Sequence, residues 1–154
     1  MDWGLFLTFL GACGAAAATG AMFKPGDWYD ALSKPSWTPP DWVFPVTWTV
    51  LYVLMAWSAS RIAQLPGSGQ AMGFWALQIA FNTLWTPVFF GLRRMGAGMV
   101  IILCLWAAVA LTLVAFWRLD WLSGLIFAPY LVWVTIASAL NFSVWRRNPA
   151  GVPA

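Results

Sequence analysis

The sequence predicts an all-α integral membrane protein, a bundle of five transmembrane helices with a long loop between the first two. Apolar residues make up 62% of the 154 residues and charged residues only 8%, which is not the balance of a soluble domain. Five apolar stretches are long enough to cross a hydrocarbon layer of about 30 Å, at roughly 20 residues per helix. They are apolar all round, whereas the strands of a membrane barrel are short and alternating.

The ends of the apolar runs set the expected helices. We expect them over residues 3–23, 45–63, 71–91, 98–117 and 122–144, within a single membrane domain that comprises residues 1–154. Pro45 can open the second helix without losing a hydrogen bond, and the Pro-Gly-Ser-Gly run at 66–69 stops it. Pro87 and Pro129 fall inside the third and fifth helices and should bend them.

The first apolar run is expected to be a retained helix and not a cleaved signal peptide. Its N-terminal flank carries Asp2 and no Lys or Arg, and the run is longer than the apolar region of an ordinary signal sequence.

Residues 24–44 form the one long segment that is rich in Trp, Pro and charge. Loops of this length are usually functional or disordered. We expect this loop to be a lid over a binding site, with a purely structural cap as the alternative.

The positions of the cations predict the orientation of the bundle. Arg61 and Arg118 would lie on one face. The opposite face, with residues 24–44 and the C-terminus, would hold Lys24, Lys34, Arg93, Arg94, Arg146 and Arg147. By the positive-inside rule the second face is cytoplasmic. The net charge of +3 then needs no nucleic acid partner to explain it.

The chain offers no recognisable catalytic constellation. It has no His, and its acids are all Asp and lie outside the expected spans, so no catalytic residue, general acid-base pair or intramembrane proton relay is indicated. Cys13 and Cys104 lie within spans without metal-ligand spacing. We therefore expect no metal site and no obligatory cofactor, and the absence of His excludes histidine ligation of haem iron.

Uncharged polar and aromatic residues recur at helical spacing inside three spans. They are Trp48 and Tyr52 on the second helix, Gln78 and Asn82 with Trp85 on the adjoining turn of the third, and Trp133, Ala137 and Asn141 on the fifth. Residues four apart share one helix face. Taken singly, each could serve interhelical packing.

The depths of these side chains favour a shared cavity. At about 1.5 Å of rise per residue, Asn82 and Trp133 fall near mid-membrane, and the others lie toward the face of residues 24–44. We expect a pocket that opens beneath the loop, with Lys34 and Arg146 at its rim. A suitable ligand is large, flat and mostly apolar, with an acidic tail for the rim cations. Porphyrins fit this description.

Four motifs along the chain carry a family resemblance. They are Trp28-Tyr29-x-x-Leu32-x-Lys34-Pro35-x-Trp37-x-Pro39-Pro40, Pro45-x-x-Trp48-x-x-Leu51-Tyr52, Asn82-x-x-Trp85-x-Pro87-x-Phe89-Phe90-Gly91, and Pro129-Tyr130-x-x-Trp133 followed by Leu140-Asn141. In this order they resemble the translocator protein family, the tryptophan-rich sensory or peripheral benzodiazepine receptor group, in a bacterial form.

The resemblance implies a five-helix bundle, commonly a homodimer, that binds porphyrins, cholesterol and synthetic isoquinoline carboxamides or benzodiazepines under a loop. The family's ligand-site pattern falls on Trp48, Asn82, Trp133 and Ala137, with Trp28 and Trp37 above. It also implies a link to tetrapyrrole regulation and stress signalling in bacteria.

A sterol motif of this family is only partly present. Where animal relatives carry Leu/Val-x-Tyr-x-Arg/Lys, this chain has Leu140, Phe142 and Arg146 across residues 140–146, so the tyrosine hydroxyl is missing. Such short patterns are weak predictors of cholesterol binding. The alternative is an ordinary helix end anchored at the interface.

Small residues recur every fourth position on the first helix, as Gly11, Ala15 and Thr19 and again as Ala12, Ala16 and Gly20. Such faces allow close approach of helices, either in a dimer or within the bundle.

Three functions follow as hypotheses. The favoured one is a receptor or sensor whose ligand orders the loop. The others are a translocator of porphyrin or sterol and an enzyme that degrades porphyrin in light with Trp as a redox participant.

Overall fold

The computed structural model describes residues 1–149, and these residues form helices and no strand. The elements in order are α1 (Trp3–Met22), α2 (Gly26–Asp30), α3 (Val43–Ile62), α4 (Gly69–Thr86), the π-helical segment η1 (Pro87–Gly91), α5 (Met95–Leu119) and α6 (Trp121–Arg147). The predicted all-α class is confirmed.

Four helices, α1, α3, α5 and α6, are long and apolar enough to cross a membrane. They fit a multi-pass membrane protein. The 18-residue α4 is not among the four, because Gln70, Gln78 and Asn82 place three amide side chains on it and lower its mean hydropathy. Gln78 and Asn82 are buried where helices meet, as the next section describes, whereas Gln70 is exposed at the start of α4.

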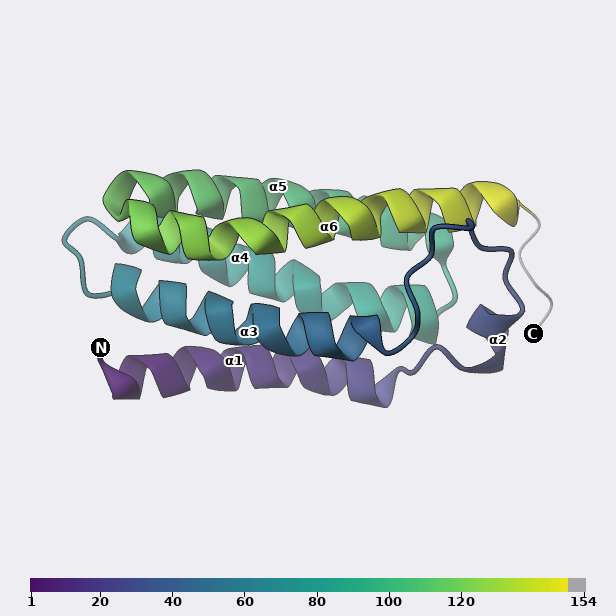
Figure 1. Cartoon of the computed structure of the whole chain (residues 1–154), viewed down its shortest axis with the longest axis horizontal. Helices are drawn as coiled ribbons and strands as arrows, with labels where there is room; N and C mark the ends of the chain where they lie inside the picture. The colour runs from purple at the N-terminus through teal and green to yellow at the C-terminus, as the bar shows by residue number, and fades with distance from the viewer. Residues whose placement is uncertain (150–154) are drawn as a thin grey trace.

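The long helices lie side by side along the longest axis of the molecule, with residue 1 at one end and the end of α6 at the other (Figure 1). α5 packs against α4 and α6, α1 packs against α3 and α4, and α3 also contacts α6. Short connections join α3 to α4 and α5 to α6 at the end that holds residue 1. The segment between α1 and α3 covers part of the opposite end.

The helix boundaries differ from the expected ones at several points. The segment expected as a loop over 24–44 contains α2, and α3 begins at Val43, two residues before Pro45. α6 continues to Arg147, three residues beyond the expected end at 144. Asp120 ends α5 and caps α6, because its carboxylate accepts a hydrogen bond from the Ser123 backbone N–H. A single residue therefore separates these two helices.

Pro87 changes the geometry of the backbone after α4. Proline has no N–H and its ring displaces the preceding turn, and the chain continues as the π-helical segment η1. The Leu92 N–H then donates to the Pro87 carbonyl over 2.9 Å. π-Helical turns are frequent at functional sites, and this one directs Phe89 and Phe90 toward the same end as α2.

Two hydrophobic clusters hold the bundle. The larger one runs through its middle and includes Met55, Val109, Phe116, Phe127 and Tyr130, all almost fully buried. The smaller cluster joins the α1–α3 segment to the ends of α5, η1 and α6; it consists of Trp28, Tyr29, Leu32, Phe89, Met95, Leu140 and Val144. The segment is thus packed onto the bundle by aromatic side chains.

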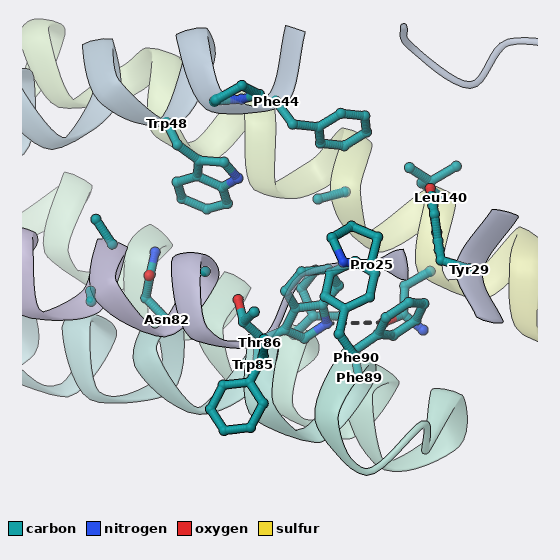
Figure 2. Close-up of a pocket in the computed structure, with 18 of the residues that line it drawn as sticks. Pro25, Tyr29, Phe44, Trp48, Asn82, Trp85, Thr86, Phe89, Phe90 and Leu140 are labelled. Atoms are coloured by element: carbon teal, nitrogen blue, oxygen red, sulfur yellow. Dashed lines mark hydrogen bonds between the residues drawn. The ribbon is translucent and has the colours of Figure 1, made fainter. Parts of the chain in front are cut away.

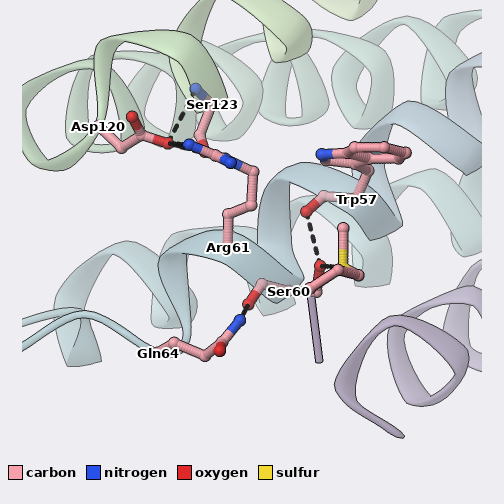
Figure 3. Close-up of polar contacts among 7 residues, drawn as sticks. Trp57, Ser60, Arg61, Gln64, Asp120 and Ser123 are labelled. Atoms are coloured by element: carbon pink, nitrogen blue, oxygen red, sulfur yellow. Dashed lines mark hydrogen bonds and ion pairs between the residues drawn. The ribbon is translucent and has the colours of Figure 1, made fainter. Parts of the chain in front are cut away.

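At the opposite end an ion pair fixes α3 to the α5–α6 junction (Figure 3). The Arg61 guanidinium donates from Nη2 to Asp120 Oδ2 over 2.8 Å and from Nε to Ser123 Oγ over 3.2 Å. The Ser123 hydroxyl also donates to the Asp120 carboxylate. This group joins three helices where their connections are shortest.

Gly124→Ala should destabilise the protein by about 1–3 kcal/mol, as overpacking of a tight contact does. A Cβ at this position would lie 2.7 Å from Trp117 Cα, and backbone cannot move aside as a flexible side chain can. Gly14→Ala is the matched control, since its Cβ would meet nothing within 4 Å and alanine favours a helix. Thermal unfolding of the detergent-purified protein measures both; equal loss in the two variants would contradict the packing argument.

The Asp120 group should also make stability depend on pH. The Ser123 hydroxyl first, and the Arg61 guanidinium after it, lower the pKa of Asp120. A carboxyl with a lowered folded-state pKa contributes stability that is present above its unfolded pKa of about 3.9 and is lost as pH falls through the folded value. Asp120→Asn keeps the helix cap, and near neutral pH it should unfold at a lower temperature than the wild type. The difference in melting temperature should shrink as pH falls below about 3.9 and through the lowered folded-state pKa of Asp120. A difference that stays constant over this range would refute the assignment.

Candidate functional site

A cavity of about 690 Å³ lies within the half of the bundle nearest α2. Its walls come from α1, α3, α4 with η1, and α6, and α5 contributes Ile102 and Leu105. Six of the eight residues proposed from sequence as the ligand site line this cavity. They are Trp48, Tyr52, Asn82, Trp133, Ala137 and Asn141.

Figure 2 shows how these side chains are presented. Trp48 of α3 and Asn82 of α4 lie on facing sides, and Tyr29, Phe89 and Phe90 gather toward the end near Leu140. A shared cavity from these three helices is what the helical spacing predicted.

Trp28 and Trp37, the other two proposed site residues, do not line the cavity. Trp28 is buried and meets Phe89 edge to face, with ring centroids 5.9 Å apart. Trp37 is 50% exposed. Between them, Tyr29 and Asp30 reach the cavity instead, because α2 turns successive side chains to different faces.

A chain of hydrogen bonds forms the deep end of the cavity. The Tyr52 hydroxyl donates to Asn82 Oδ1 over 3.0 Å, and Asn82 Nδ2 donates to the Tyr130 hydroxyl over 2.8 Å. Tyr130 then donates to Gln78 Oε1 over 2.8 Å. Gln78 and Tyr130 are almost fully buried, where an unpaired polar group would be costly. The network therefore ties α3, α4 and α6 together around Asn82.

A second pair of hydrogen bonds supports the end nearer α2. Trp85 Nε1 donates to Asn141 Oδ1 over 3.0 Å, and Asn141 Nδ2 donates to the Met95 carbonyl over 3.1 Å. Asn141 is thereby fixed between α4 and the first residue of α5. Trp85 also stacks on Phe89 with centroids 5.0 Å apart, so the indole is held flat against the cavity wall.

Trp133 leaves one hydrogen-bond donor without a partner. Its Nε1 is buried, and within the described residues no acceptor reaches it. The ring meets Phe44 and Trp48 edge to face, with centroids 5.7 and 6.4 Å away. Trp48 in turn stacks on Tyr52 at 5.5 Å. The cavity thus offers aromatic faces and edges, and the Trp133 indole N–H in its wall has no partner.

Hydrogen bonds between distant segments hold the covering segment in place. The Ser33 backbone N–H donates to Asn148 Oδ1 over 3.0 Å, and Asn148 Nδ2 donates back to the Ser33 carbonyl over 2.9 Å. The same Nδ2 donates to the Val144 carbonyl at 2.7 Å. The Asn148 amide acts as a peptide group would in a strand pair, so it joins the segment to the end of α6.

The rim of the cavity is acidic, which corrects the sequence-based expectation of cations there. Asp30 and Asp41 line the cavity, whereas Lys34 and Arg146 do not. The Lys34 ammonium lies over the Tyr29 ring, 4.6 Å from its centroid. Burial first, then Asp41 and Asp30, raise the pKa of Tyr29, so the phenol stays neutral near physiological pH.

The three residues of the partial sterol motif do not share a face. Leu140 is buried and lines the cavity, whereas Phe142 is 46% exposed. The Arg146 guanidinium lies 5.8 Å from the Phe142 ring centroid, as expected for residues four apart on a helix. Phe142 and Arg146 therefore face the outside of α6.

Sequence reasoning missed the α1 wall and the aromatic end. Ala16, Ala17, Gly20 and Ala21 line the cavity; Ala16 and Gly20 were assigned to a helix-contact face, and their spacing alone could not distinguish a partner helix from a ligand space. Gly11 and Ala15 are exposed. Tyr29, Phe44, Phe89 and Phe90 also line it; their aromatic character was the available signal.

Comparison with known proteins agrees with this geometry. The sequence profile of the TspO/MBR family matches residues 6–146. The chain belongs to this family. It is 58% identical to the tryptophan-rich sensory protein of Cereibacter sphaeroides over 148 residues, 96% of this chain and 94% of the relative.

Two further relatives show the breadth of the family. Protein CrtK of Rhodobacter capsulatus is 55% identical over 157 residues, covering 99% of this chain and 98% of the relative. The human translocator protein is 36% identical over 137 residues, 84% of this chain and 81% of its own length. The chain therefore matches bacterial and animal TspO/MBR members over most of their lengths.

Asn148→Ala should loosen the covering segment without unfolding the bundle. The change removes both hydrogen bonds to Ser33, and net losses of about 0.5–1.5 kcal/mol per bond apply to such contacts. Hydrogen exchange of the amides of residues 28–36 should quicken, while those of α5 stay protected. Asn148→Asp keeps an acceptor for the Ser33 N–H, so its exchange rates in this segment should lie between those of the wild type and Asn148→Ala. Unchanged exchange in Asn148→Ala would show that the aromatic cluster alone holds the segment.

Proposed function

We propose that this protein is a membrane receptor or sensor that binds porphyrins, such as protoporphyrin IX and haem-type tetrapyrroles, in the cavity beneath the α1–α3 segment. The observation that carries the proposal is the cavity itself. It is mainly aromatic and apolar, has a few fixed polar groups, and its volume of about 690 Å³ is that of a small-molecule site.

The chemistry of the walls supports a flat, apolar ligand. Trp48, Trp85 and Trp133 come from three different helices, so an inserted macrocycle would meet indole faces and edges on several sides. The Trp133 Nε1–H is buried and unpaired, and we propose that it donates to a ligand acceptor once the ring turns toward the cavity. Ligand binding would then act on the covering segment, because Tyr29 belongs both to the cavity wall and to the cluster that packs this segment down.

The proposal includes five membrane crossings. α4 and η1 together span Gly69–Gly91, 18 plus 5 residues, which is enough to cross a bilayer. The amides in the middle of this span, Gln78 and Asn82, are buried against other helices. We propose that α2 and the end of α6 lie in the cytoplasm, where six of the eight Lys and Arg residues would gather. The homodimer implied by family resemblance belongs to the same proposal.

Other ligands and activities follow from the family resemblance. Sterols such as cholesterol, and isoquinoline carboxamides, are proposed as further occupants of the cavity. One relative is named a sensory protein and another a translocator protein, and transport of porphyrin or sterol is the alternative to sensing. Tetrapyrrole regulation and stress response are the proposed cellular setting.

The three indoles at the cavity also favour a second candidate, light-dependent degradation of a bound porphyrin. Trp side chains beside an excited macrocycle can take part in redox chemistry without His or a carboxylate. Illumination of the complex, followed by absorbance, separates this activity from simple binding.

A titration with protoporphyrin IX in the dark tests the receptor proposal. Saturable quenching of Trp fluorescence is expected, with low-micromolar or tighter affinity. Trp133→Phe removes the unpaired donor and should weaken binding by about three- to tenfold, the loss of one hydrogen bond. Asn82→Ala should weaken it further by disordering the Tyr52–Asn82–Tyr130 network.

Trp57→Phe is the matched control, because Trp57 is on α3, 42% exposed and outside the cavity lining. It should leave affinity unchanged. Quenching that never saturates, or that responds equally to Trp57→Phe and Trp133→Phe, would reject the cavity as the porphyrin site.

A further inference from the structure

Two carboxylates stand at the mouth of the cavity without cationic partners. Asp30 ends α2, Asp41 lies shortly before α3, and both are exposed residues that line the cavity. Among residues 1–149 the ion pair is that of Arg61 and Asp120, at the far end of the bundle. Both carboxylates are close enough to the buried Tyr29 hydroxyl to influence it.

The cations at this end of the molecule are placed elsewhere. None of Lys24, Lys34, Arg93, Arg94, Arg146 and Arg147 lines the cavity. Lys24 lies between Phe23 and Pro25, which do line it. Lys34 directs its Nζ to the carbonyls of Asp30 and Leu32, each 3.3 Å away, and over the Tyr29 ring. Arg146 lies over Phe142 on the outer side of α6. This end of the molecule therefore carries six cations, whereas the charged residues that line the cavity, Asp30 and Asp41, are both acidic.

We propose that this mouth selects ligands by the charge of their polar end. It favours a flat apolar molecule that ends in an amine or a neutral group over one that ends in carboxylates. The inference rests on the proposed function, because it takes the cavity as the porphyrin site. Among tetrapyrroles of the same ring, those with esterified or amidated side chains bind more tightly than those with free propionates.

Coulomb's law sets the size of the effect. Two unit charges about 6 Å apart in a water-like dielectric change a binding constant about threefold. Two such pairs give about tenfold between a charged and an uncharged porphyrin, and hence about a hundredfold between a dicationic and a dianionic one at low salt. Because both carboxylates are exposed, salt should reduce this spread once the screening length falls to a few ångströms.

Three porphyrins with one macrocycle test the proposal on the full-length protein in an uncharged detergent. They are protoporphyrin IX, its dimethyl ester, and a derivative in which both propionates carry aminoalkyl amides. Dark quenching titrations should rank the amine form tightest and the free acid weakest at low salt. The differences between the three affinities should shrink at about 0.5 M salt.

The variants locate the effect. Asp30→Asn combined with Asp41→Asn should bring the three affinities together, chiefly by strengthening binding of the free acid. Asp27→Asn is the matched control, since Asp27 is on α2 as well but does not line the cavity, and it should leave the ranking intact. Circular dichroism confirms that each variant is folded.

Each result decides between the two proposals. Charge selection at the mouth is overturned, and the porphyrin site is retained, by any of three results. The three porphyrins bind the wild type equally, the ranking survives the double substitution, or Asp27→Asn abolishes the ranking as fully as the double substitution does. Tightest binding of the free acid likewise overturns charge selection. Failure of all three porphyrins to bind saturably rejects the proposed function itself, and the inference with it.

Discussion

The cavity depends on the hydrogen bonds of one amide. Asn82 accepts from Tyr52 and donates to Tyr130, which links α4 to both α3 and α6. Inside an apolar bundle each of these groups would be costly if unpaired. The bonds therefore fix the spacing of the three helices, although single intramembrane hydrogen bonds are worth only about 0.6 kcal/mol on average. Side chains above this network are held apart, and the cavity is the space that results.

The two ends of the bundle differ in how they are closed. At the end that holds residue 1, Arg61, Asp120 and Ser123 join three helices, and a single residue links α5 to α6. At the other end a longer segment crosses the cavity, held by aromatic contacts and by Asn148. Regions with fewer contacts open more readily. A ligand therefore enters and leaves the cavity more easily at the end near α2 than at the end held by Arg61, Asp120 and Ser123.

The positions of the site residues on their helices could be predicted from sequence, but their partners could not. Spacing by four placed Trp133, Ala137 and Asn141 on one face of a helix, and the structure brings that face to the cavity. The same rule suggested that Ala16 and Gly20 meet another helix, because small residues serve close packing and open space equally well. Gln78 was recognised as polar, yet its bond to Tyr130 joins residues 52 positions apart.

The sequence by itself determined the helical class, the apolar character of the helices and the residues that punctuate them. These properties depend on composition and on short-range periodicity, which act within one helix. Only the tertiary structure decided the charge of the cavity mouth, where Asp30 and Asp41 replaced the expected Lys34 and Arg146. The tertiary structure also decided that Trp28 packs against Phe89 and does not line the cavity. Both outcomes follow from how α2 turns and where its segment crosses the bundle, and contacts between distant residues set that path.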